Sequence, residues 1–189
     1  MALTPERISA NTKKYFETTK KINAMNDALM EFLGVNFIKA PASNMRDYHN
    51  AFEGGLIEHL LKVTSYAVMV NKSLPEAEQV NHDSLLKVCL LHQIGKANLF
   101  KPCTSEWHIK NQGRMYEFNE ELTSMRVSER SLYYIAKHGI ELTEEEFSAI
   151  SNFDKTDDKQ AELHNSMLGE ILKMGSTLAI KNEKKSNHA

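Results

Sequence analysis

The sequence predicts an all-α fold, a helical bundle with one small β-hairpin inserted. Apolar residues recur at three- and four-residue spacing along most of the 189-residue chain, which is typical of helices with one buried face. Only residues 107–118 alternate apolar and polar side chains around a glycine, as a short hairpin does. The length fits one domain, and 41% hydrophobic with 25% charged residues indicates a globular rather than a disordered chain.

Charge and composition exclude several classes of protein. The 23 basic and 25 acidic residues nearly balance, so there is no strong nucleic-acid signature. No apolar run approaches the ~18 residues of a membrane span, and the first residues lack the apolar core of a signal peptide. Cys89 and Cys103 have no CxxC partner and are interpreted as reduced thiols. We expect a cytoplasmic protein with no membrane contact; its oligomeric state has no sequence signal.

In the first half of the chain, a cap at Thr4 followed by proline predicts a helix to about residue 20. A second helix is expected over residues 22–32, ending at Gly34, and then a loop over residues 35–50. A long helix begins at residue 53 or 54. The next helix, capped by Asp83, is apolar nearly all round and should be buried.

The second half begins with the predicted hairpin, which should turn at residues 111–113. Helices resume near Ser128, and Thr143 with Glu146 forms a capping box. A polar loop over 154–160 and a last helix over 161–180 complete the chain. The predicted organisation is therefore N-terminal helices (1–34) packing on a core, a helical domain (35–181) and a frayed tail (182–189).

Two segments could carry chemistry, GGLIEH and LLHQIGK. The first places His59 one helical turn after a pair of glycines, and the second places His92 and Gln93 near the end of the leucine-rich helix, just before Lys96. Buried polar side chains need partners, because unpaired ones cost a few kcal/mol. A metal ion and an ordinary hydrogen-bond network would both satisfy them, and residue types alone favour the network.

The two segments together resemble the HD-domain superfamily of metal-dependent phosphohydrolases. The later segments of residues 45–180 follow the order of a bacterial and phage-associated branch of that superfamily. The resemblance implies an HD-domain helical bundle in which His59 and His92 are metal ligands.

The chain departs from the family pattern at its carboxylates. Gln93 replaces the aspartate of the second motif, and Ser176 stands where the family has a closing aspartate. Near Phe153, some members of the branch have a further histidine. Two imidazoles without carboxylates leave a divalent cation uncompensated. We therefore expect a degenerate site in which manganese, magnesium, iron or zinc binds weakly or not at all.

Further residues could complete a phosphoester site. Gln93 and Lys96 are the candidate catalytic residues: Gln93 would orient water or substrate, and Lys96 would hold phosphate. A second phosphate cradle could form at the start of the helix near Ser128, although a simple capped helix explains that pattern equally well. The residues of this cradle are Arg126, Ser128 and Arg130. Three further residues could line the cleft: His49, His138 and Ser176.

Two functions fit these residues. The first is a divergent phosphohydrolase acting on a nucleotide or nucleic-acid phosphoester. The second is a non-catalytic module that binds a nucleotide or a protein through the same cleft. The expected ligand is a small phosphorylated molecule or a nucleotide.

Overall fold

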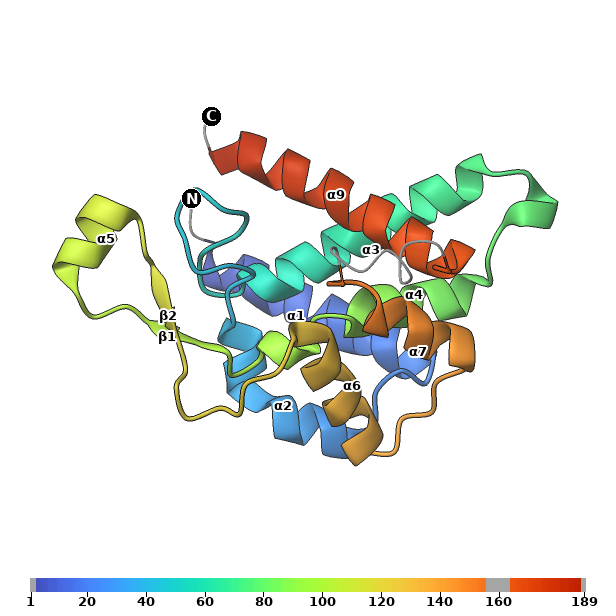
Figure 1. Cartoon of the computed structure of the whole chain (residues 1–189), viewed down its shortest axis with the longest axis horizontal. Coiled ribbons are helices and arrows are strands. Elements are labelled where there is room, and N and C mark those ends of the chain that lie inside the picture. Colours follow the sequence, from blue (N-terminus) through green and yellow to red (C-terminus); the bar gives the residue numbers. More distant parts are fainter. Residues whose placement is uncertain (1–2, 156–163, 188–189) are drawn as a thin grey trace.

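The computed structural model describes residues 3–155 and 164–187 and confirms an all-α fold with a small two-stranded insertion (Figure 1). In the described part, no helix is both long and apolar enough to span a membrane. The helices are α1 (Pro5–Lys21), α2 (Asp27–Lys39), α3 (Gly55–Ser73), α4 (His82–Leu91), α5 (Glu106–Gln112), α6 (Val127–Lys137), α7 (Glu144–Ser151) and α9 (Met167–Asn187), with short 3-10 helices η1 (Glu76–Glu78) and η2 (Ile94–Lys96). The strands are β1 (Phe100–Pro102) and β2 (Tyr116–Phe118).

Helix α3 is the centre of the core. It packs most extensively against α9, which lies across it, and also against α4, α1 and α2 (Figure 1). The close approach of α3 and α9 depends on Gly175, where a Cβ atom would lie 2.8 Å from Ala67 Cβ and 2.9 Å from Val63 O. The two helices are antiparallel, because Glu183 of α9 bonds to His59, which precedes Val63 on α3.

The N-terminal helices differ from the prediction at α2. The Thr4 cap of α1 is confirmed, since its hydroxyl accepts from Arg7 N. Helix α2 begins only at Asp27, where Asn26 caps it, and it does not end at Gly34. Gly34 adopts φ 51° and kinks the helix, which then continues to Lys39 across residues predicted to be a loop and across the predicted boundary at 34–35. Burial of Phe37, whose ring lies 5.1 Å from that of Tyr15, favours this continuation.

Helices α3 and α4 match the prediction closely. Gly54 caps α3 in the left-handed conformation (φ 78°), which glycine adopts without strain. Leu85, Val88 and Leu90 of α4 are fully buried, which confirms a helix inside the core. The cap of α4 is Asn81 rather than Asp83, because the Asn81 side chain accepts from Ser84 N.

The predicted hairpin over 107–118 is wrong, although a small sheet is present. Residues 106–112 form α5, capped by Ser105 and ended by Gly113 at φ 65°. The antiparallel partner of β2 is β1, upstream of α5, and Phe100 pairs with Phe118. An alternation of only a few residues fits a helix as well as a strand, and the Ser105 cap decides between them. The insertion projects from one end of the molecule (Figure 1).

The C-terminal segment is more ordered than predicted. The capping box of Thr143 and Glu146 is confirmed. Of the predicted loop and last helix, residues 156–163 lie outside the described part, and α9 begins at Met167. Helix α9 continues to Asn187, so the frayed tail predicted over 182–189 is wrong for residues 182–187. Ala179 and Glu183, one turn apart, are both buried, and their packing explains why the helix continues.

Replacing Gly175 with alanine should destabilise the protein by about 1–3 kcal/mol, because the added methyl group would clash with Ala67 Cβ and Val63 O. The measurement is the free energy of unfolding in urea. Thr177→Ala, at an exposed position on the same helix, is the control and should change it by less than about 0.5 kcal/mol. A Gly175→Ala variant more stable than the natural protein would show that helix propensity outweighs the clash.

Candidate functional site

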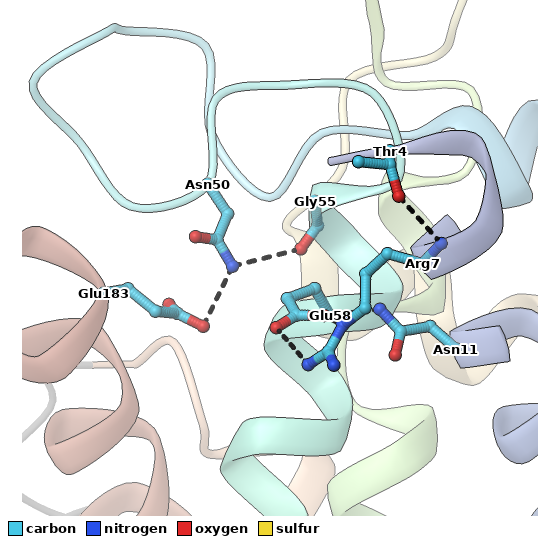
Figure 2. Close-up of polar contacts among 7 residues, drawn as sticks. All are labelled: Thr4, Arg7, Asn11, Asn50, Gly55, Glu58 and Glu183. Carbon is cyan, nitrogen blue, oxygen red and sulfur yellow. Dashed lines mark hydrogen bonds and ion pairs between the residues drawn. The ribbon is translucent and has the colours of Figure 1, made fainter. Parts of the chain in front are cut away.

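A buried carboxylate anchors the first histidine of the pair. His59, on α3, is fully buried, and its Nδ1 lies 2.8 Å from Glu183 Oε2 on α9. Asn50 Nδ2 donates to the other carboxylate oxygen of Glu183 at 2.9 Å and also approaches Gly55 O at 3.5 Å (Figure 2). Three separate segments therefore meet at Glu183: the loop before α3, α3 itself and the end of α9.

A glycine brings this loop against α3. A Cβ atom at Gly55 would lie 2.2 Å from Asn50 O, which no side chain tolerates. The second glycine of the GGLIEH motif thus allows Asn50 to reach Glu183. Glu58, next to His59, faces the other way: it forms an ion pair with Arg7 and accepts from Asn11 (Figure 2).

The second histidine lies at the end of α4. His92 is fully buried, and its Nδ1 lies 2.9 Å from Cys89 O. Since a carbonyl oxygen only accepts, the proton of the neutral ring lies on Nδ1 and the lone pair on Nε2. The ring of Phe153 packs edge-on against His92, with 4.4 Å between ring centroids. An apolar ring therefore covers His92 near the position at which the resemblance predicted a further histidine in some members of the branch.

A third imidazole belongs to this cluster. The ring of His49 lies 4.5 Å from that of His59, between centroids. Burial lowers the pKa of all three rings, to about 2 for His49 and about 3 for His59 and His92. His59 contributes to the lowered pKa of both other rings, and Lys96 to that of all three. The three rings are therefore neutral near pH 7.

The outer nitrogen of each ring has no partner among residues 3–155 and 164–187. The Nε2 atoms of His49, His59 and His92 are buried and form no hydrogen bond within the described residues. Leaving a buried polar atom unpaired costs about 1–3 kcal/mol. Three such atoms are the unusual feature of this cluster, because buried polar atoms ordinarily have partners.

Lys96 and Gln93 bond to each other. Lys96 Nζ donates to Ala42 O at 2.6 Å and to Gln93 Oε1 at 3.0 Å. Burial lowers the pKa of Lys96 to about 8, against the opposing charges of Glu183 and Asp154. The amide oxygen of Gln93, the only atom with which this side chain could ligate a metal, thus accepts from an ammonium group.

The His59–Glu183 pair shares one proton. Burial raises the pKa of Glu183 to about 8, opposed by Lys62 and by the hydrogen bond from Asn50. One hydrogen lies between Glu183 Oε2 and His59 Nδ1. When the carboxyl group carries it, the neutral ring has its own proton on Nε2; when Nδ1 of the neutral ring carries it, Glu183 is a carboxylate and Nε2 has a lone pair. A cation at His59 Nε2 needs the lone pair there, so it places the proton on Nδ1 and leaves Glu183 negatively charged.

The predicted phosphate cradle near Ser128 is filled by the chain itself. The backbone amide and hydroxyl of Ser128 both donate to the carboxylate of Asp154. Arg130 is buried and donates to Thr123 O, while Arg126 is exposed. The two donors of Ser128 that were expected to bind phosphate therefore already hold an anionic side chain.

The remaining predicted residues lie apart from the cluster or beside it. His138 ends α6, and its ring packs on Phe32 at 4.7 Å between centroids, so it is not a member. Ser176 is buried on α9, two helical turns before Glu183. The carboxylate that contacts His59 therefore comes from a residue that the sequence analysis placed in a frayed tail. The apolar spacing that ends at Ala179 extends to Glu183 and could have indicated it.

The donors of the cluster do not form a complete metal cage. No group of three or more His, Cys, Asp or Glu residues in the described part of the chain could hold a metal ion. His59 and His92 each have one nitrogen anchored and, among the described residues, the other unpaired, so each could supply one ligand. Imidazole nitrogens suit zinc, iron and similar ions better than magnesium.

Comparison with known proteins gives one informative similarity. The chain is 36% identical over 86 residues to the dihydroneopterin 2',3'-cyclic phosphate phosphodiesterase of Methanocaldococcus jannaschii. The match covers 44% of this chain and 33% of the relative, so the chain spans about a third of the length of the curated relative. No family model and no solved structure matches. The similarity supports a phosphohydrolase-like relationship.

Replacing Glu183 with alanine should lower the free energy of unfolding by about 2 kcal/mol or more, because it leaves Asn50 Nδ2 and His59 Nδ1 buried without their partner. Chemical denaturation measures the change. Glu145→Ala removes the same side chain from an exposed position on α7 and should have little effect. Equal stability of the two variants would mean that the contact with Glu183 contributes nothing to folding.

Proposed function

We propose that this chain is a divergent HD-type phosphodiesterase that acts on a small cyclic phosphoester and binds a divalent metal weakly through His59 and His92. The observation that carries the proposal is the state of the two rings. Each has Nδ1 held by an oxygen, and each has a buried Nε2 with no hydrogen-bond partner in the part of the chain that the structure describes. Histidines that bind metals have this arrangement, because the second contact fixes the tautomer and the direction of the lone pair.

The missing carboxylates have a partial substitute in Glu183. With the proton on His59 Nδ1, the carboxylate lies one imidazole away from the ion and offsets part of its charge. This compensation is weaker than direct ligation. We therefore expect a metal affinity well below that of a site with two aspartates, with water and substrate oxygens completing the coordination. A bound ion would supply Lewis-acid activation of the phosphate and of an attacking water.

Lys96 is the residue proposed to bind the phosphate. Its ammonium group is largely buried beside the histidines, and a cation there attracts an anionic phosphoester strongly. Gln93 holds Lys96 in place through the contact at 3.0 Å. The similarity to a cyclic phosphate phosphodiesterase supports a cyclic phosphoester as the substrate class.

A second candidate function is a non-catalytic module that binds a nucleotide. One observation favours it: the oxygen of Gln93, at the position of the family's aspartate, accepts from Lys96. An amide in that position cannot take up a proton from water.

The test is hydrolysis of adenosine and guanosine 2',3'-cyclic phosphates by the purified chain with zinc, iron(II) or manganese. We expect turnover that needs high micromolar to millimolar metal and stops on addition of EDTA. His92→Ala should reduce it at least 100-fold, because it removes a ligand. His82→Ala, an exposed histidine at the start of α4, is the control and should retain full activity.

Two outcomes would contradict the proposed phosphodiesterase activity or its dependence on a metal. Absence of hydrolysis at every metal concentration, with a folded protein that still binds the cyclic nucleotides, would establish the binding module. Hydrolysis that persists in EDTA and in His92→Ala would show that the reaction needs no metal bound by His92.

Gln93→Asp should tighten metal binding by at least tenfold, because it adds the missing carboxylate next to His92. The melting temperature with and without manganese measures the change, since an ion that binds only the folded state adds about 2.7 kcal/mol at a hundred times Kd. The natural protein and the control Gln79→Asp, at an exposed position, should respond little. A natural protein that already gains several degrees with manganese would show that its site is not degenerate.

A further inference from the structure

A cavity of about 650 Å³ lies between the end of α2, the two-stranded sheet and the segment after η2. Its volume is in the range of small-molecule sites. None of the three histidines lines it. Its walls include Asn36, Asn98, Phe100, Tyr116 and the lysines Lys39 and Lys101.

The walls of this cavity offer aromatic faces and free amides. Phe100 and Tyr116 come from the two paired strands, and both are partly exposed to the cavity. Burial and the charge of Glu53 raise the pKa of Tyr116, so its hydroxyl keeps its proton and can donate. The side-chain amides of Asn36 and Asn98 have no bonding partner among the described residues. An amide presents a donor and an acceptor side by side, as the edge of a heteroaromatic ring does.

The charges around the cavity cancel. Lys39 lies 3.4 Å from Glu53, and Lys101 lies 2.9 Å from Glu121, between charged atoms. Both acids also line the cavity. Paired charges on the wall favour a neutral, polar ring over an anion.

A short segment that lines the cavity leads directly to the residue that Lys96 contacts beside the histidine cluster. Ala40 and Pro41 line it, and the next residue, Ala42, accepts the hydrogen bond of Lys96 Nζ. Ala97 also lines it and directly follows Lys96. A ligand with its ring in the cavity would therefore have its phosphate end toward Lys96.

We infer that this cavity binds the neutral bicyclic heteroaromatic head, a purine or a pterin, of the phosphoester. Phe100 and Tyr116 stack on the ring, and Asn36 and Asn98 bond to its edge. This inference rests on the proposed function for the role of the phosphate end, but ring binding itself needs neither metal nor catalysis.

The experiment measures binding of guanosine and of neopterin, which carry no phosphate, by isothermal titration calorimetry. We expect micromolar to millimolar affinity that is at least tenfold weaker in Tyr116→Ala and in Asn98→Ala. The matched control is Tyr133→Ala, a half-exposed tyrosine on α6 that does not line the cavity, and it should bind as the natural protein does. Melting temperatures of all variants show that each is folded.

The outcomes separate this inference from the proposed function. Ring binding that is lost in Tyr116→Ala but unchanged in His92→Ala supports the inference, whether or not the chain hydrolyses cyclic phosphates. Hydrolysis of cyclic phosphates with no measurable ring binding, or with ring binding unaffected by Tyr116→Ala and Asn98→Ala, would overturn the inference and leave the proposed function standing.

Discussion

The contact between His59 and Glu183 holds the functional part of this fold together. It joins residues 124 positions apart, and it fixes the ends of α3 and α9 against each other at 2.8 Å. Asn50 joins the same carboxylate, so the loop that carries His49 is tied to it as well. A carboxylate buried this deeply is stable only while its partners are present. The geometry of the histidine cluster therefore depends on the C-terminal helix.

Local signals predicted much of the fold. The caps at Thr4 and Thr143, the glycine at position 54 and the apolar run of α4 each involve a few neighbouring residues, and the structure confirms them. The two histidine motifs are local in the same sense. The errors fall where a distant contact overrides a local signal. Gly34 is a helix-ending residue by itself, but burial of Phe37 against Tyr15 continues the helix beyond it.

In the candidate site, too, features set by neighbouring residues were predicted and features set by distant contacts were not. Sequence motifs identified His59, His92 and Lys96, whereas their partners could not be identified in this way. Glu183 lies in a run of lysines and asparagines that is typical of a solvent-exposed tail. Its burial follows from the antiparallel packing of α9 on α3, which no short segment encodes. In the same way, no local signal predicts the hydrogen bond from Lys96 to Gln93, which occupies the amide oxygen of that side chain.

The carboxylate of Asp154 competes with any free anion for the donors at the start of α6. Its carboxylate accepts from the amide and hydroxyl of Ser128, at the end of the helix where the macrodipole attracts anions. An intramolecular group acts at an effective concentration of the order of millimolar or more. A free phosphate at cellular concentration would have to displace it, and the helix start is thereby protected from adventitious anions. In the proposed function, recognition of the phosphate is consequently left to Lys96, the last residue of η2.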